Sequence, residues 1–370
     1  VQYFPSCEYL GNGRFVSLIS KDEYQATFKK EVDSTYMNVM VPSKRPPPFK
    51  IEGEAKCTAI NGLPDLKQQY SDFVIIGAGK TAIDAILFLL KNGVKPDFIK
   101  WIMPRDSWIL DRSHIQPTLE SVGKLFTNQI IPGAESKSID DFFERVSKAG
   151  GLLRIDENIK PTMYRCSTVT KSELKELRRI KNVVRKGRVK IINDKEILLD
   201  GGSIPTTLET LHIDCAGDGL AKRPPKKIFS SRKITLQSVR TCQQVFSAAL
   251  LGFVEASFEE DEKKNELCKP VPHPNSDIDF LRNTIADALN QESWINEPIL
   301  SRWLEESRLN PQSHILKGSF AFKVLSIINK IPFIRLSNSA LEAQARAQET
   351  IKQLLETEEV DNYTNSNKIN

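Results

Sequence analysis

The segment from Gly77 to Ala82 reads Gly-Ala-Gly-Lys-Thr-Ala, in which small residues stand at the spacing GxGxxA. Gly77 permits a tight turn, Gly79 lets the backbone approach a pyrophosphate, and Ala82 lets a helix pack closely on a sheet. The amino terminus of such a helix offers free N–H groups and the positive end of its dipole to phosphates. The motif therefore predicts a dinucleotide phosphate loop. The expected cofactor-binding residues are Gly77, Ala78, Gly79, Lys80, Thr81 and Ala82.

The end of this motif, Gly79-Lys80-Thr81, also resembles the end of an ATP-binding P-loop. A P-loop needs a further glycine five residues before Gly79, because a long loop has to wrap the phosphates. Val74 occupies that position, inside an apolar run. An ATPase or kinase site is therefore excluded by the length of the loop.

The elements around the motif are those that a dinucleotide site requires. Residues 73–76 form a short apolar run, typical of a parallel strand that is buried on both faces. Residues 80–92 have apolar positions at helical spacing, and Gly93 is suited to end that helix. Residues 98–103 predict a second strand. Strand, turn, helix and strand within about thirty residues make up the Rossmann building block.

The residues after the second strand indicate which dinucleotide is bound. An NAD site usually places an acid there to bind the ribose 2′-hydroxyl, whereas an arginine suits a 2′-phosphate. Arg105 stands at this position and Asp106 follows one residue late, so NADPH is favoured. The alternative for Arg105 is a solvated charge paired with Asp106. Core packing is expected for Trp101, whereas Trp108 is a candidate to cover the adenine.

The rest of the chain alternates between extended and helical patterns. Residues 13–35 predict antiparallel strands in a meander, and four prolines between residues 42 and 48 predict an extended linker, with a domain boundary near residue 50. Residues 105–180 look mostly helical, with capping sequences at Ser138 and Thr170. Further strands are expected over residues 182–184, 189–192, 197–199 and 208–215.

Helical patterns return in the last third of the chain. Helices are expected over residues 239–255 and 341–355, followed by a polar, disordered tail after Glu356. The apolar stretch from Phe320 to Leu336 contains two lysines, an arginine and a proline, so it is too broken to span a bilayer. A core helix is the first interpretation of this stretch, and a membrane-surface contact is the alternative.

Composition excludes several classes of function. The 370 residues, 40% of them hydrophobic and 27% charged, suit a soluble protein of two domains. A net charge of +5 without a long basic block gives no support for nucleic-acid binding. The histidines are scattered without metal-ligand spacing, and His212, in an apolar strand, is expected to be a core residue. No catalytic acid, base or nucleophile is identified.

The six cysteines contain no CxxC pair, which argues against both a zinc cluster and a redox-active dithiol. Buried reduced thiols are expected for most of them, and this predicts a reducing, cytoplasmic location. The chain begins at Val1, without a methionine or a charged leader. It therefore looks like a fragment that starts inside a domain.

The order of these parts resembles the flavin-containing monooxygenase-like flavoproteins, which carry two dinucleotide-binding domains. In that family a Rossmann-like NAD(P)-binding domain is inserted in an FAD-binding domain, and two strand crossings join the domains. The resemblance implies that Asp33–Thr35 and Cys215–Gly217 are the crossings. It also implies that Gly217 and Asp218 contact FAD, the aspartate at the ribityl chain. The implied domains are an incomplete FAD-binding domain (1–50 and 205–335), an NAD(P)-binding domain (51–204), and a helix with a disordered tail (336–370).

The sequence departs from this family in two ways. The first GxGxxG, which would hold FAD, is expected upstream of Val1, and the histidine of the monooxygenase fingerprint is missing before the Gly77 loop. The resemblance still implies hydride transfer from NADPH to FAD, with a small-molecule substrate that the sequence leaves open. The alternative is a non-catalytic module that binds NADP(H) as a sensor. A dithiol reductase is disfavoured because CxxC is absent.

Overall fold

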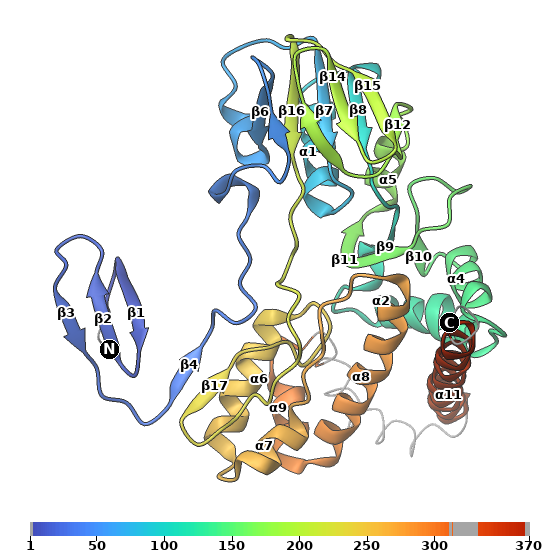
Figure 1. Cartoon of the computed structure of the whole chain (residues 1–370). Helices are drawn as coiled ribbons and strands as arrows, with labels where there is room; N and C mark the ends of the chain where they lie inside the picture. Colours follow the sequence, from blue (N-terminus) through green and yellow to red (C-terminus); the bar gives the residue numbers. More distant parts are fainter. Residues whose placement is uncertain (1–2, 311–312, 314–331, 367–370) are drawn as a thin grey trace.

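The computed structural model describes residues 3–310, 313 and 332–366, and its largest sheet is parallel (Figure 1). Five strands lie in the order β12-β8-β7-β16-β6. Their bounds are Lys56–Ala59 (β6), Asp72–Ile76 (β7), Ile99–Ile102 (β8), Val183–Val184 (β12) and Thr210–Asp214 (β16). After β7, the chain adds β8 and β12 on one side of this strand and then β16 on its other side. The strand order therefore reverses between β7 and β16. Ligands of open α/β sheets bind at the carboxyl edge of such a reversal.

The predicted strand–turn–helix–strand unit is confirmed, with α1 (Lys80–Lys91) between β7 and β8. One face of α1 is buried, and its Ala82 and Ile86 are both 0% exposed. This face packs on the sheet together with α5 (Lys171–Leu177), in one hydrophobic cluster. The small side chain of Ala82 allows the helix to lie close to the strands.

A second, four-stranded sheet covers the other face of β7 and β8. Its order is β15-β14-β13-β5, with bounds Lys50–Ile51 (β5), Val189–Ile192 (β13), Glu196–Leu199 (β14) and Gly202–Pro205 (β15). Buried residues from both sheets, such as Val74 and Ile192, form one hydrophobic cluster. The strands predicted over residues 189–192 and 197–199 are confirmed, whereas the sequence does not predict β15.

The two sheets share one core, and we call them, with the segments between their strands (residues 50–214), the sheet unit. Every residue of β16 is buried, and β16 pairs with both β6 and β7. A strand with this burial has to lie inside a parallel sheet. The dinucleotide-binding domain predicted over residues 51–204 thus ends too early, because β16 completes its sheet.

Residues 105–180 contain three strands that the sequence does not predict. They form the sheet β10-β9-β11, with bounds Ser107–Asp111 (β9), Leu152–Leu153 (β10) and Met163–Val169 (β11). Besides α5, the helices of this region include α2 (Leu119–Leu125), a π-helix (Phe126–Ile130), α3 (Ile131–Ala134) and α4 (Ile139–Lys148). The capping box at Thr170 is confirmed, with Glu173 as its partner. Ser138 caps α4 through the amide of Asp141 alone.

A second body, the helical unit (residues 233–310), lies below the sheet unit in Figure 1. Its elements are β17 (Lys233–Thr235), α6 (Gln244–Ser257), α7 (Asp261–Leu267), α8 (Asp277–Asn296) and α9 (Pro298–Glu306). Strand β17 pairs in parallel with β4 (Glu31–Asp33). The chain therefore leaves this unit after β4, builds the sheet unit, and returns beside its own starting strand. α6 begins five residues later than predicted, because the amide of Val239 donates to Ser247 Oγ and its carbonyl accepts from Asn290.

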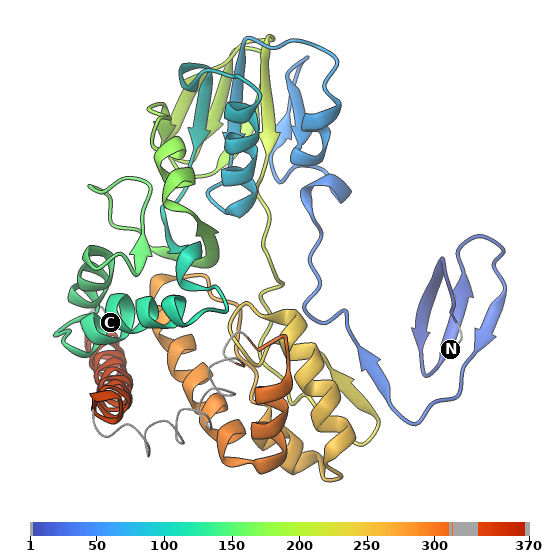
Figure 2. The same ribbon diagram turned by 180° about the vertical axis from the view of Figure 1, so that it is seen from behind.

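The N-terminal meander predicted over residues 13–35 is confirmed in part, because residues 7–25 form an antiparallel sheet, β1-β2-β3, whereas residues 31–33 (β4) pair in parallel with β17. Its strands are Cys7–Gly11 (β1), Arg14–Ser17 (β2) and Glu23–Gln25 (β3), and both views show it standing apart from the sheet unit (Figures 1 and 2). Short 3-10 helices occur at Pro42–Lys44, Ile60–Asp65, Pro96–Phe98 and Arg112–His114.

At the carboxyl end, α11 (Pro332–Ser366) packs against α3 and α8. It continues past Glu356 to Ser366, so the tail predicted to be disordered is helical to that point. Most of the apolar stretch from Phe320 to Leu336 lies outside the described residues. No helix in the described part of the chain combines the length and apolar composition that a bilayer crossing requires.

Four of the six cysteines are free thiols, in line with the expectation for most of them, and the other two are bonded to each other. Cys166 in β11 and Cys242 before α6 form a disulfide, although 76 positions separate them. Cys7, Cys57, Cys215 and Cys268 are free, and the last two are buried. Only the fold brings the two bonded cysteines together, so no local sequence motif predicts the bond.

Asp287 on α8 accepts a hydrogen bond from the backbone amide of Thr241, with an N–O distance of 2.9 Å. Burial raises the pKa of Asp287 from 3.8 to about 6, against the opposing effect of the Arg240 guanidinium. The folded protein thus binds the proton of the Asp287 carboxyl group more tightly than the unfolded chain does. The stability that protonation supplies is complete at low pH and is lost as the pH rises from about 4 to 6.

We expect Asp287→Asn to remove this pH dependence, because asparagine keeps an acceptor for Thr241 but carries no charge. Between about pH 4 and pH 7, the free energy of unfolding of the wild-type protein should fall by about 2 kcal/mol relative to the variant. Urea unfolding at the two pH values measures this difference. Parallel pH responses in the two proteins would contradict the assignment.

Candidate functional site

Gly77 directly follows β7 and has a conformation that only glycine adopts readily. Its φ is 135°, and a Cβ placed on it would lie 2.8 Å from the carbonyl oxygen of Cys215. Its amide donates to the carbonyl of Ile102 at 3.0 Å, and its own carbonyl accepts from Trp101 Nε1 at 2.7 Å. Three neighbouring strands therefore fix the turn that starts the loop. Trp101 is fully buried, as the sequence predicts.

Gly79 has a different environment from Gly77. It is the N-cap of α1 with a φ of −89°, and nothing lies within 4 Å of the position that its Cβ would occupy. No side chain caps the first amides of α1. The amino end of this helix is therefore bordered by open space, which is the arrangement that a pyrophosphate needs.

The other residues of the loop have smaller roles. Ala82 is fully buried beneath the helix, whereas Ala78 and Thr81 are partly exposed. Lys80 forms an ion pair with Asp84, one turn along α1. The Lys80 side chain is therefore paired within the helix. The loop would then bind phosphate mainly through its backbone.

Arg105 lies three residues beyond the end of β8, the strand that pairs with β7 beside the Gly77 loop. Its Nη2 donates to Asn275 Oδ1 at 3.1 Å, and Arg165 Nη2 donates to the same oxygen at 2.6 Å. Burial lowers the pKa of Arg105, and the charges of Arg165 and Arg188 lower it further. We call these three residues (Arg105, Arg165 and Arg188) the arginine cluster. Such a concentration of positive charge suits an anion.

Asp106 does not pair with Arg105, so that alternative is wrong. It is buried, and its two oxygens accept from Arg185 Nε at 2.8 Å and Arg185 Nη2 at 3.0 Å. Trp108 is 0% exposed and stacks on Phe143 with ring centroids 5.2 Å apart. The expected cover over an adenine is therefore wrong as well, because this ring fills the core between β9 and α4.

Asp218 lies in the linker that leaves β16. Its Oδ1 lies 2.7 Å from Arg165 Nη1 and 3.8 Å from Lys222 Nζ. Gly217 packs toward Pro42, whose Cδ would lie 3.3 Å from an added Cβ. The contacts that the resemblance implies between Gly217 or Asp218 and FAD remain predictions.

The two linkers between the units run side by side. Arg45 Nη1 pairs with Asp214 Oδ2 at 3.1 Å, and the amide of Ala221 donates to the carbonyl of Met37 at 3.1 Å. Residues 215–217 thus lie beside residues 42–45, whereas Asp33 lies beside Thr235. The two segments expected to be the crossings, 33–35 and 215–217, therefore pair with other partners.

Other candidate features lie elsewhere. A cavity of about 240 Å³ is lined by Asp72, Lys100 and Thr210 among others, at the amino-terminal edge of the parallel sheet and away from the Gly77 loop.

His212 is fully buried, and its ring nitrogens contact the Lys56 carbonyl and Thr206 Oγ1. Burial lowers the pKa of His212, so the prediction of a satisfied core histidine is confirmed. Within the described residues, no group of three acidic, histidine or cysteine side chains is placed to hold a metal.

Sequence reasoning missed four residues of the site, which are Arg165, Arg185, Arg188 and Asn275. Arg165 and Asn275 reach Arg105 from segments 60 and 170 residues away in the chain, from β11 and from the start of α8. Arg185 directly follows β12, a strand that the sequence predicts. Like Arg105, it therefore stands after the end of a predicted strand, and this position is the one feature of the sequence that could have placed it at the same sheet edge.

Comparison with known proteins finds relatives by sequence. No protein-family model matches the chain. Uncharacterised proteins of Mycobacterium bovis and Mycobacterium tuberculosis are 44% identical over 330 residues, which is 85% of this chain. The match spans 59% of the length of these relatives.

One similar solved structure is the ornithine N-hydroxylase of Kutzneria sp. 744, determined with reduced FAD, NADP+ and L-ornithine. The sequences are 15% identical, the TM-score is 0.28, and the match covers 55% of this chain and 49% of that protein. A likeness at this level carries no inference about fold or function.

Proposed function

We propose that the edge of the parallel sheet at Gly77 binds NADPH. The observation that carries the proposal is the open space at Gly79, at the uncapped amino end of α1. The pyrophosphate would lie there on backbone amides. Arg105, after the adjacent strand, would bind the 2′-phosphate, with Arg165 and Arg188 adding positive charge.

We infer further that the whole protein is a cytoplasmic flavoprotein oxidoreductase. NADPH would supply a hydride and FAD would accept it, with oxygenation of a small molecule as an extension of that chemistry. The course of the chain supports this proposal, since the sheet unit is inserted between the paired strands β4 and β17. This is the domain arrangement that the sequence resemblance implies. The role of this chain would be to position the nicotinamide dinucleotide.

The test is the visible absorption spectrum of the purified full-length protein, followed by addition of NADPH without oxygen. We expect a yellow flavin band that bleaches when NADPH is added. Bleaching by NADH but not by NADPH would contradict the cofactor assignment. A colourless protein that binds no NADPH would overturn the proposal as a whole.

The alternative function is a non-catalytic NADP(H)-binding sensor. One observation favours it: Asp218, the residue expected to contact FAD, has its carboxylate between Arg165 and Lys222. Tight NADPH binding by a protein that holds no flavin and does not oxidise NADPH would select this alternative.

A further inference from the structure

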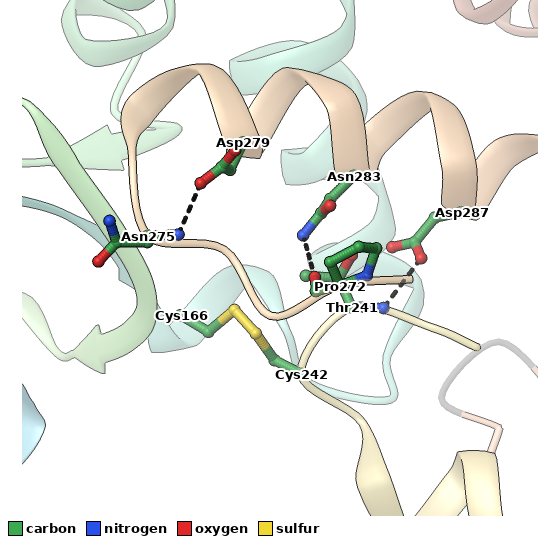
Figure 3. Close-up of a disulfide and its surroundings, with 8 residues drawn as sticks. All are labelled: Cys166, Thr241, Cys242, Pro272, Asn275, Asp279, Asn283 and Asp287. Atoms are coloured by element: carbon green, nitrogen blue, oxygen red, sulfur yellow. Dashed lines mark hydrogen bonds between the residues drawn. A yellow bond between two sulfur atoms is a disulfide. The ribbon is translucent and has the colours of Figure 1, made fainter. Parts of the chain in front are cut away.

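We propose that the Cys166–Cys242 disulfide is a reducible link that holds the helical unit against the arginine cluster. The bond joins β11 of the sheet unit to the segment that precedes α6 (Figure 3). The Cα atoms of the two cysteines are 6.4 Å apart, within the range of protein disulfides. The bond is thus a covalent connection between the two units.

The neighbours of the disulfide show what this connection positions. Cys242 follows Thr241, whose amide is held by Asp287 of α8. Asn275 lies just before the same helix, and its amide is held by Asp279 (Figure 3). The segments that carry Cys242 and Asn275 are therefore both attached to α8. They meet β11 at two consecutive residues, because Arg165 binds Asn275 and Cys166 binds Cys242.

This arrangement couples the disulfide to Arg105. Asn275 Oδ1 accepts hydrogen bonds from both Arg105 and Arg165, so it holds two members of the arginine cluster in place. Cys166 is covalently next to Arg165, at the point where the pairing of β11 with β9 is interrupted. Opening the disulfide would leave the hydrogen bond to the neutral Asn275 oxygen and the packing of Tyr164 on Phe280 of α8 to hold this part of β11 against the helical unit.

Two features make the bond suitable for reduction. Neither cysteine is fully buried, so part of each residue is exposed to solvent. Their φ angles are 56° and 59°, in the left-handed region that residues other than glycine rarely adopt. The backbone at both ends can relax once the bond is broken.

The chemistry requires a thiol reductant of the glutathione or small-dithiol class. A reductant thiolate attacks one sulfur of the pair, the S–S bond breaks, and a mixed disulfide forms. A second reductant thiol then displaces the protein sulfur and completes a new disulfide. Two electrons and two protons pass to Cys166 and Cys242, and two reductant thiols are oxidised.

Thiol counting tests whether the link exists. The air-oxidised protein is denatured without reductant and alkylated with N-ethylmaleimide, and its peptides are analysed by mass spectrometry. We expect adducts at Cys7, Cys57, Cys215 and Cys268 only, with Cys166 and Cys242 added after reduction. Alkylation of Cys166 and Cys242 without reductant would overturn the proposal.

Hydrogen exchange tests whether the link holds the two units together. We expect reduction to speed amide exchange in residues 163–169 and 271–276 by about tenfold, since local opening governs exchange there. Cys166→Ser should exchange at the faster rate without reductant. The matched control is Cys268→Ser, which removes a free buried thiol and should respond to reduction as wild type does. Equal exchange by the oxidised and reduced wild-type protein would overturn the proposal, whether or not the serine variant folds.

The effect on the nucleotide rests on the proposed function. We expect the reduced protein to bind NADPH about threefold to tenfold more weakly than the oxidised protein, because one ordered contact of the arginine cluster is lost. Equal NADPH affinities of the oxidised and reduced proteins would overturn the proposal that the disulfide controls the arginine cluster. Absence of NADPH binding in both states would instead contradict the proposed function. The hydrogen-exchange experiment would still test whether the disulfide holds the two units together.

Discussion

Replacement of Gly79 by valine is expected to abolish dinucleotide binding while the fold persists. The backbone of Gly79 adopts an ordinary φ of −89°, and no atom lies within 4 Å of its Cβ position, so the protein accommodates a side chain there. The valine would instead fill the space in which a pyrophosphate approaches the amides of α1. We expect the affinity for NADPH to fall by about 100-fold or more. Calorimetry measures the affinity, and circular dichroism verifies the fold.

Gly77→Ala is the matched control, and the opposite result is expected. Its φ of 135° is strained for any side chain, and the new Cβ would lie 2.8 Å from the Cys215 carbonyl oxygen. We expect a loss of about 2–4 kcal/mol in the free energy of unfolding. Urea unfolding should thus show a damaged fold for Gly77→Ala and a normal one for Gly79→Val. Unchanged NADPH affinity in folded Gly79→Val protein would refute the assignment of the loop.

The Gly77 unit could be predicted because its signals are local. A buried run, two glycines and a helix with one apolar face follow one another within 20 residues, and each element depends mainly on its own residues. β11 could not be predicted in this way. Its Arg165, Ser167 and Thr168 interrupt the apolar pattern, and its pairing partner β9 lies more than 50 residues earlier in the chain. Such a strand is stabilised by contacts distant in sequence rather than by propensity.

The chemistry of the candidate site was only partly predictable for the same reason. The sequence places Arg105 and Asp106 side by side, and it does not reveal that their side chains have separate partners. Only the fold brings Arg185 from β12 to Asp106, and Asn275 from the helical unit to Arg105. The disulfide is a second example, since Cys166 and Cys242 are 76 positions apart. Absence of CxxC excludes a local dithiol but not a pair that the fold assembles.

Cofactor preference is expected to depend on Arg105. NADPH differs from NADH by the 2′-phosphate, so the preference has to come from groups near the end of β8. A guanidinium can donate two hydrogen bonds to this phosphate, and charge-assisted bonds contribute roughly 1.5–3 kcal/mol each. Arg105 is partly exposed and has to give up or share its bond to Asn275, which reduces the gain. We therefore expect a preference for NADPH of about tenfold to 100-fold, at roughly 1.4 kcal/mol per decade.

Arg105→Ala should weaken NADPH binding by this factor and leave NADH binding nearly unchanged, as measured by titration with each cofactor. The structure supplies a second variant, because Asp106 is held and neutralised by Arg185. In Arg185→Ala the Asp106 carboxylate loses this partner and repels the 2′-phosphate, so the preference should shrink although Arg105 is intact. Equal losses for both cofactors in Arg105→Ala would mean that Arg105 is structural or contacts the pyrophosphate. A wild-type preference for NADH would refute the cofactor assignment outright.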